Sequence, residues 1–272
     1  FKPAAFLELA AREGMTHTLV VPAIYNLLLR HPAFDPAALT EWRLGGFGGA
    51  PMPEGTIRAL AERLPDLALF NAYGATETTS PTTVMPPGMQ GERLTSVGRV
   101  LPCADVRIMD ADGRELPPGE PGEIWIAGPM VVPGYWDNAE ATAREFSGGY
   151  WKSGDIGSCD ADGFVYVHDR IKDLVNRGGY KVYCAEVESA LSLHADVVEA
   201  AVIARPDPVL GEKSVAVVVR RDPACDETAL RVHCARLLAD YKVPDDFFFR
   251  DAPLPRNANG KILKRALREP HP

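Results

Sequence analysis

The sequence is poor in the features that mark disulfide-rich, zinc-binding and membrane-spanning proteins. It has five cysteines, an odd number, and no two of them stand at CxxC spacing. A disulfide framework and a cysteine zinc site are therefore disfavoured, and reduced thiols in a cytoplasmic protein fit better. No apolar run approaches the roughly 18 residues that a spanning helix needs, and no signal peptide is recognisable. The histidines are scattered and form no HExxH or HxxxH pattern.

The chain also lacks an excess of positive charge. Its net charge is −8, so nucleic acid is not an expected partner. The 272 residues are 46% apolar and 24% charged, which is typical of a globular protein with room for one large domain or two ordinary ones. There are no internal repeats and no low-complexity tracts.

Two common phosphate-binding patterns are missing as well. The glycine cluster at 45–49 does not match GxxxxGK[ST], and it fails GxGxxG because Pro51 occupies the last position. Glycines after a strand can let a ligand approach the backbone closely. A tight turn between a strand and a helix explains the cluster equally well, so both interpretations stay open here.

Hydrophobic periodicity and turn residues divide the chain into three parts. The first part alternates β-prone and helical segments and indicates a parallel α/β layer: strands at 18–21, 42–44 and 67–70, with helices at 3–13, 23–30 and 54–63. The second predicts a small antiparallel sheet or distorted barrel: strands at 105–110, 122–127 and 163–168. The third predicts a compact α+β unit: helices at 185–193 and 227–238, with strands at 197–204 and 214–220.

We therefore expect an α/β plus α+β fold in three domains. The end of a large α/β domain would occupy residues 1–80, a β-rich, barrel-like subdomain 81–169, and a compact α+β domain 170–272, with the joint near 169–172.

Residues 71–79, NAYGATETT, carry the richest set of ligand-binding groups. A nucleotide site needs a ring that stacks on the base, donors for phosphate oxygens and an oxygen ligand for Mg²⁺. Tyr73 offers the ring, Glu77 the carboxylate, and the threonines at 76, 78 and 79 the hydroxyls. A polar turn after a strand would have a similar composition.

Three further segments contain candidate residues, and each also has an ordinary structural explanation. Asp155 sits in YWKSGDI, which we interpret as a Gly-flanked loop before a strand; its two oxygens match a vicinal diol such as ribose, but an Asx-type turn would look the same. The charged run 169–182 is typical of a solvated loop. Lys261 follows Asn-Gly, a turn former, and would be exposed on a mobile corner.

Taken together, these segments resemble the adenylate-forming superfamily, and within it the acyl-CoA synthetases. The matching segments are NAYGATETT at 71–79, YWKSGDIG at 150–157, DGFVYVHDRIKD at 162–173, NRGGYKVYCAEVE at 176–188 and PRNANGKILKR at 255–265. The resemblance implies a ligase that converts a carboxylic acid and ATP into an acyl-adenylate, and then transfers the acyl group to coenzyme A with release of AMP.

The resemblance also implies roles for residues in the first two parts. Tyr73 and Gly74 would contact adenine, Thr76 the phosphate, and Glu77 would hold Mg²⁺. Asp155 would bind the ribose hydroxyls, assisted by Arg170. The pocket between adenine and the acyl group would be lined by Gly46, Gly48, Gly49 and Ala50, with Tyr25 as a weaker candidate.

The third part would be a mobile lid. Lys261 matches the catalytic lysine, which would bridge the substrate carboxylate and the α-phosphate. Lys172 matches the hinge about which the lid rotates between the two half-reactions. Rotation would withdraw Lys261 and bring the loop at Gly178 and Gly179 to the thiol.

One motif of the family is absent: the Gly/Ser/Thr-rich phosphate loop of the SSGTTGxPKG type. We therefore expect the chain to be an incomplete, C-terminal portion of a synthetase that by itself lacks adenylation activity. The alternatives are a peptide-synthetase adenylation domain, which the absence of a following carrier domain disfavours, and a non-catalytic nucleotide-binding or interaction module. The acid is left open, with fatty and aryl acids both expected, and so is self-association into a homodimer.

Overall fold

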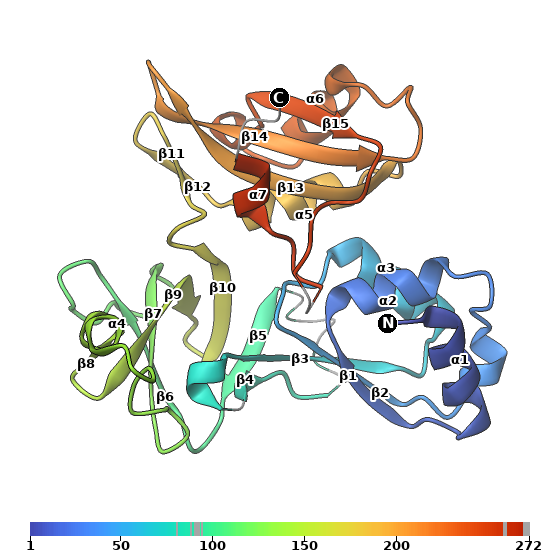
Figure 1. The fold of residues 1–272 in the computed structure, drawn as a ribbon, viewed down its shortest axis with the longest axis horizontal. Coiled ribbons are helices and arrows are strands. Elements are labelled where there is room, and N and C mark those ends of the chain that lie inside the picture. The colour runs from blue at the N-terminus through green and yellow to red at the C-terminus, as the bar shows by residue number, and fades with distance from the viewer. Residues whose placement is uncertain (80, 88, 90–92, 94, 258–259, 269–272) are drawn as a thin grey trace. The chain divides into compact units, whose positions relative to one another are not determined.

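A computed structural model describes residues 1–272 except 80, 88, 90–92, 94, 258–259 and 269–272 (Figure 1). The chain divides into two compact units, one made of residues 1–52 and 56–167 and the other of residues 53–55 and 168–272. Each unit has its own sheet. The finer division into domains at 1–80, 81–169 and 170–272 stays a prediction.

The first unit combines a few helices with one large sheet. Its helices are α1 (Pro3–Arg12), α2 (Pro22–Arg30), α3 (Glu54–Arg63) and α4 (Ala139–Glu145), with the 3₁₀ turns η1 (Pro36–Leu39) and η2 (Thr76–Thr78). Its strands are β1 (His17–Val20), β2 (Leu44–Gly48), β3 (Ala68–Gly74), β4 (Pro81–Val84), β5 (Ser96–Val100), β6 (Asp105–Met109), β7 (Gly122–Ala127), β8 (Phe146–Ser147), β9 (Tyr150–Cys159) and β10 (Phe164–Arg170). The first two residues of α3 and the last three of β10 belong to the second unit.

These ten strands form one continuous sheet in the order β1-β2-β3-β4-β5-β10-β9-β7-β6, with β8 paired to β9. Strands β1, β2 and β3 run parallel, as the alternation of strands and helices predicted, and the strands that follow pair antiparallel. The predicted mixed α/β character is thereby confirmed. Helices α1 to α3 bury their apolar faces with the parallel strands in one core that includes Leu28, Phe47 and Leu60.

Strand β2 corrects the expected boundary of the second strand. The sequence predicted a strand at 42–44 that ends at the glycines, but β2 runs through them to Gly48. An added Cβ at Gly48 would lie 2.3 Å from the carbonyl oxygen of Ala72 on the neighbouring strand β3. A side chain there is sterically excluded, so glycine is needed for the close approach of two strands.

The second unit is an α+β domain, as predicted. Its helices are α5 (Cys184–Ser192), α6 (Glu227–Ala235) and α7 (Lys264–Arg268), with the 3₁₀ turn η3 (Asp240–Lys242). Its strands are β11 (Val175–Arg177), β12 (Tyr180–Val182), β13 (Val197–Asp207), β14 (Gly211–Arg220) and β15 (Asp246–Arg250). The sheet has the order β12-β11-β14-β13, and β15 pairs with β14.

Alternate residues of β13 and β14 supply two cores, one on each face of this sheet. Val202 and Val218 pack with α5 and α6 in one core, whereas Ile203 and Val217 pack with Leu267 of α7 in the other. Because the sheet is covered on both faces, nearly continuous apolar runs mark these two strands in the sequence.

The five cysteines are unpaired, and they differ in exposure: Cys103 is exposed, Cys159 is half-buried, and Cys184, Cys225 and Cys234 are buried. Burial raises the pKa of the Cys234 thiol to about 11, which leaves very little thiolate at pH 8. We expect a thiol reagent at pH 8 to label Cys103 quickly and the three buried thiols only after unfolding. Mass spectrometry of the labelled native and unfolded protein measures this, and rapid native labelling at Cys234 would contradict the buried position.

Candidate nucleotide-binding site

Two residues predicted to hold adenine and ribose are in direct contact. The hydroxyl of Tyr73, at the end of β3, donates a hydrogen bond of 2.7 Å to Oδ2 of Asp155 on β9. Asp155 is only 5% exposed, whereas Tyr73 is half-buried and packs at the edge of the core formed by β5, β7, β9 and β10. The two motifs, 82 residues apart, therefore contribute to one site.

Asp155 does not lie in a loop before a strand, as the sequence suggested, but inside β9. Residues 153–155 of β9 face the single residue Ile124 of β7, between the pairs Trp125–Lys152 and Glu123–Ile156. Gly154 has a φ of +69°, a backbone conformation that glycine adopts without strain and that makes this bulge possible. The Gly154 N–H donates to Oε1 of Glu123 at 3.1 Å. Because of the bulge, Asp155 lies outside the regular pairing of β9 with β7.

The sheet must curl to bring these residues together. Strands β3 and β9 are four steps apart in the sheet order, which corresponds to about 19 Å across a flat sheet. A tyrosine and an aspartate side chain cannot span that distance. The contact therefore requires strong coiling of the sheet between β3 and β9, consistent with the distorted barrel expected for this part.

The three threonines of the 71–79 segment have different environments. Thr78 is fully buried; its Oγ1 accepts from Ala75 N at 3.0 Å and donates to Ala75 O at 3.0 Å. Thr79 has φ of +52° and donates to Met130 O at 2.9 Å. Thr76 is exposed at the start of η2. The first two hydroxyls thus hold the turn in shape, which leaves Thr76 as the threonine best placed for a ligand.

Glu77 is oriented by a tyrosine that sequence reasoning missed. The Tyr135 hydroxyl donates to Glu77 Oε1 at 2.9 Å and accepts from Trp151 Nε1 at 3.3 Å. Burial is the main cause that raises the pKa of Tyr135, which keeps this phenol protonated and able to donate. Val132 N also donates to the Glu77 carbonyl at 2.8 Å. The loop before α4 therefore fixes both the backbone and the carboxylate of Glu77.

The predicted acyl-pocket residues lie at and after the end of β2. Gly48 ends the strand, Gly49 has φ of +75°, and Ala50 is exposed. Tyr25, the weaker candidate, is 0% exposed and donates to Gly46 O at 2.9 Å, so it is a core residue that supports β2. Their role toward an acyl group stays a prediction.

Family models and solved structures match this arrangement. Residues 1–136 match the model described as AMP-binding enzyme, and residues 186–261 match its C-terminal domain. The chain belongs to the AMP-binding enzyme family. A feruloyl-CoA synthase of Amycolatopsis is 39% identical over 269 residues, which are 98% of this chain and 54% of that protein.

Two solved structures have the same fold as this member of the AMP-binding enzyme family. An amide bond synthetase from Marinactinospora thermotolerans superposes with a TM-score of 0.90 at 38% identity, covering 98% of this chain and 54% of the other. The o-succinylbenzoate CoA synthetase of Bacillus subtilis, solved with its acyl-adenylate intermediate and also with ATP and a magnesium ion, superposes at 0.86 with 34% identity, covering 100% and 54%. The chain thus spans about half the length of the relatives it matches.

Within the second unit, Lys261 lies on a braced turn. Lys261 N donates to Asn257 Oδ1 at 2.9 Å, and Asn257 N donates to Lys261 O at 2.9 Å. Arg256 donates to Gly260 O at 2.8 Å and to Glu199 Oε1 at 2.6 Å, which anchors the turn on β13. The Lys261 side chain is exposed, as expected. Asn259, half of the predicted Asn-Gly turn, lies outside the described residues.

The run 169–182, which could have been a plain solvated loop, contains the hairpin of β11 and β12. Gly178 and Gly179, with φ of +56° and +90°, form its two-residue turn, a geometry that favours glycine at both positions. Gly178 N also donates to Leu210 O at 2.8 Å. Upstream, Arg170 ends β10, and Lys172 is exposed in the turn that follows.

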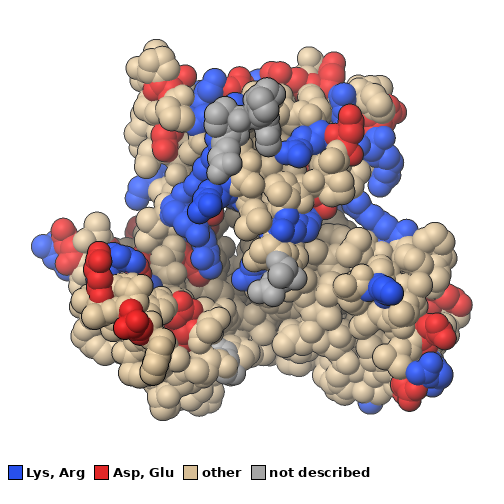
Figure 2. Space-filling model, viewed as in Figure 1, with Lys and Arg blue, Asp and Glu red and all other residues tan. Residues whose placement is uncertain are grey.

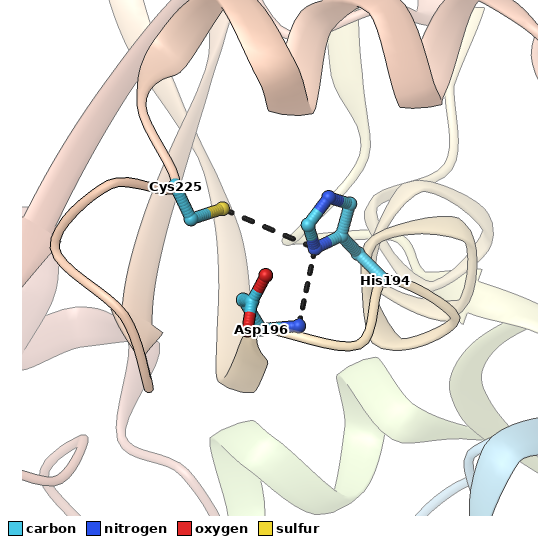
Figure 3. Close-up of side chains that lie close together, drawn as sticks. All are labelled: His194, Asp196 and Cys225. Carbon is cyan, nitrogen blue, oxygen red and sulfur yellow. Dashed lines mark hydrogen bonds between the residues drawn. The ribbon is translucent and has the colours of Figure 1, made fainter.

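One cluster outside the predicted site combines three ligand types: His194, Asp196 and Cys225, whose donor atoms all lie within 4.8 Å of one another (Figure 3). Nδ1 of His194 accepts from the Asp196 N–H at 3.2 Å, and the Cys225 thiol lies 3.9 Å from the same nitrogen. Because Nδ1 of His194 already accepts a backbone N–H from the neighbouring loop residue Asp196, we interpret the cluster as a link between two loops.

Among the residues that the structure describes, no helix is long and apolar enough to cross a bilayer.

Proposed function

We propose that the protein containing this chain is an AMP-forming ligase that activates a carboxylic acid as an acyl-adenylate and transfers the acyl group to an acceptor. The observation that carries the proposal is the contact between Tyr73 and Asp155, with Glu77 held separately by Tyr135 in the same unit. The hydrogen bond from Tyr73 to Asp155 and the bond from Tyr135 to Glu77 show how those side chains are held.

In this proposal Tyr73 stacks on adenine with Gly74 beside it, Thr76 donates to phosphate, and Asp155 accepts from the ribose hydroxyls with help from Arg170. The roles fit the environments of the three side chains: the Tyr73 ring lies at the edge of a core, the Thr76 hydroxyl is exposed and the Asp155 carboxylate is buried. A carboxylate has acceptor sites on both oxygens, so Asp155 can accept from a ribose diol while it keeps the bond from Tyr73.

Glu77 fits a magnesium ion by the chemistry of its donor, because Mg²⁺ is commonly held by one or two carboxylates together with substrate phosphates. The ion would neutralise phosphate charge when bound. Tyr135 would keep the Glu77 carboxylate in place, since its hydroxyl donates to one oxygen and leaves several acceptor sites on the carboxylate. A related synthetase has been solved with ATP and a magnesium ion.

In the second unit, Lys261 would enter the site as the catalytic cation, with rotation about Lys172 replacing it by the hairpin turn at Gly178 and Gly179. The braced backbone of Lys261 presents an exposed side chain, which suits a group that must approach two negatively charged reactants. In this proposal residues 170–272 form the lid.

Coenzyme A is the acceptor that we favour, because a CoA synthase and a CoA synthetase are among the relatives. An amine acceptor is the second candidate, since an amide bond synthetase superposes at 0.90. Three cations at or near the hairpin are engaged by carboxylates, which leaves these three less available for the phosphates of coenzyme A: Arg177 by Asp245 at 2.6 Å, Lys213 by Asp246 at 2.7 Å and Lys242 by Glu186 at 2.7 Å. Acidic and basic side chains are likewise interspersed in Figure 2.

Aryl acids are the substrates to test first, because feruloyl and succinylbenzoyl groups occur in the names of two relatives. Fatty acids are the alternative, and a cytoplasmic location would suit either. The test is acid-dependent ATP–pyrophosphate exchange across an acid panel, followed by AMP release with coenzyme A or with amines. The 272 residues hold no Gly/Ser/Thr-rich phosphate loop, so this chain by itself should give no exchange.

Asp155→Asn should raise the KM for ATP by about tenfold or more, since an amide offers one acceptor oxygen and no charge to a diol. Asp112→Asn, on a turn where the side chain is 69% exposed, is the matched control and should leave the KM unchanged. Initial rates of pyrophosphate exchange at varied ATP measure both. An unchanged KM for ATP in the Asp155 variant would remove Asp155 from the nucleotide site.

A further inference from the structure

The bulge that carries Asp155 lacks the regular pairing that holds the rest of β9 against β7. Pairing stops at Lys152 and resumes at Ile156, and residues 153–155 between them have a single residue of β7 opposite them. Extra residues in a bulge leave backbone groups that the ladder does not bind, and such groups need other partners. The partners of these N–H groups determine how firmly Asp155 is held.

Side chains accept hydrogen bonds from two successive N–H groups of the bulge. Gly154 N donates to Oε1 of Glu123 on β7 at 3.1 Å, and Asp155 N donates to Oγ of Ser153 at 3.0 Å. The Ser153 bond lies within the bulge, so it moves with the bulge. The Glu123 bond joins the bulge to the neighbouring strand, so it fixes the position of Gly154 N relative to β7.

The Glu123 bond shortens the stretch of β9 that can rearrange. Relative to β7, pairing alone fixes the chain at Lys152 and at Ile156, and the dihedral angles of all the residues between them could rotate together. With Gly154 N also fixed, only the dihedral angles of Gly154 and Asp155 remain between two fixed points. Gly154 needs such a restraint, because glycine has the widest choice of backbone conformations and an added Cβ there would meet no atom within 4 Å.

Glu123 is suited to this contact because its carboxylate is itself held in place. Its Oε2 accepts from Nε1 of Trp125, two residues along β7, at 2.9 Å. Nζ of Lys152, which is paired with Trp125 across the two strands, lies 4.9 Å from the centre of the indole ring. Both partners of Glu123 are donors, and an ionised carboxylate is an acceptor at both oxygens. A glutamine would turn its NH₂ group toward one of the two donors.

We propose that Glu123 is a positioning residue for ribose recognition. It acts through Gly154 to hold Asp155 in the orientation that receives the Tyr73 hydroxyl, and the same orientation would present the carboxylate to the ribose diol. Glu123 therefore acts on the bulge and not on the nucleotide itself. The inference rests on the proposed function in one respect: the ribose role of Asp155 gives the restraint its consequence for nucleotide choice.

Hydrogen–deuterium exchange tests the restraint without any assay of activity. In the protein that contains this chain, Glu123→Ala should speed exchange at the Gly154 amide by about tenfold, the low end for one hydrogen bond to a charged group. Glu123→Gln keeps one acceptor oxygen and should give a smaller increase. Mass spectrometry of overlapping peptides across residues 153–155 measures the rates.

Glu115→Gln is the control for this measurement, because the Glu115 side chain lies in the same unit and is 55% exposed. It should leave the exchange at Gly154 unchanged. Parental exchange in both Glu123 variants would overturn the restraint.

Discrimination between ATP and 2′-deoxy-ATP tests the consequence, since only ATP offers both ribose hydroxyls. Glu123→Ala should lower the preference for ATP several-fold through the KM for ATP, while the KM for the acid stays unchanged. Initial rates of pyrophosphate exchange with each nucleotide measure the preference. A general loss of folded protein would lower both rates equally and leave their ratio intact.

Asp155→Asn, measured in the same way, separates the positioning role from the proposed function. A lower preference in Asp155→Asn together with a parental preference in Glu123→Ala would overturn the positioning role. A parental preference in both variants would reject Asp155 as the ribose ligand, which is a failure of the proposed function. Faster exchange at Gly154 would then still establish that Glu123 holds the bulge.

Discussion

Lys261→Ala should lower the rate of adenylation by on the order of 10²-fold or more in the protein that contains this chain. A carboxylate attacking an α-phosphate brings two negative groups together, and a positioned ammonium offsets that repulsion in the transition state. Acyl transfer from preformed adenylate should survive far better, because Lys261 would be withdrawn during that step. Single-turnover measurements of the two half-reactions separate the effects.

Arg265→Ala provides the control for charge in the same region, because Arg265 is exposed four residues along the chain. It should change neither half-reaction by more than about twofold, as expected for a solvated surface charge. Equal losses in both half-reactions of Lys261→Ala would show that Lys261 supports the fold or the acceptor site, and would withdraw its catalytic role.

Gly48→Ala should destabilise the first unit by about 3 kcal/mol, near the upper end of the cost of overpacking. The new methyl group would lie 2.3 Å from the backbone oxygen of Ala72, which cannot move without displacing strand β3. The predicted role of Gly48 at the acyl pocket would instead leave stability intact and change substrate preference. Urea unfolding monitored by circular dichroism distinguishes the two.

Gly45→Ala on the same strand is the matched control. The atoms nearest its new methyl group are the ends of the Leu69, Tyr25 and Leu67 side chains, at 3.0–3.2 Å, and side chains can shift where a backbone cannot. We expect a loss of about 1 kcal/mol, well below that of Gly48→Ala. Equal stabilities of the two variants would mean that the β2–β3 spacing adapts, and that glycine at 48 has another purpose.

Elements with strong periodicity could be predicted from the sequence closely. The helix expected at 54–63 is observed as Glu54–Arg63, and the strand expected at 122–127 as Gly122–Ala127. Their apolar spacing reflects burial on one face, which is a local property of the sequence. Strand β2 escaped the same reasoning because glycines have no side chain to show a pattern.

Short pairing elements and the bulge could not be predicted, because tertiary contacts determine them. Strands β11, β12 and β15 have few residues each, and they are strands only because β14 or a neighbour accepts their hydrogen bonds. Asp155 looked like a loop residue since Gly154 precedes it, and only the pairing of β9 with β7 reveals a bulge within a strand.

The residues of the candidate site likewise fall into those that the sequence reveals and those that it does not. Tyr73, Glu77, Asp155 and Lys261 could be found because their motifs keep ligand-binding residue types at recognisable spacing. Tyr135 was missed, since it acts on a side chain far away in the sequence, that of Glu77, 58 residues earlier. No local pattern encodes such a partner.

The bond between Tyr73 and Asp155 means that the carboxylate is oriented before a nucleotide binds. The phenol donates to Oδ2 at 2.7 Å, and the two oxygens of a carboxylate have further acceptor sites for the hydroxyls of a ribose. The diol would therefore meet a carboxylate whose rotation is already restricted, so that less side-chain freedom is lost on binding. The affinity for ATP would then depend on Tyr73 in two ways, through its ring and through its hydroxyl.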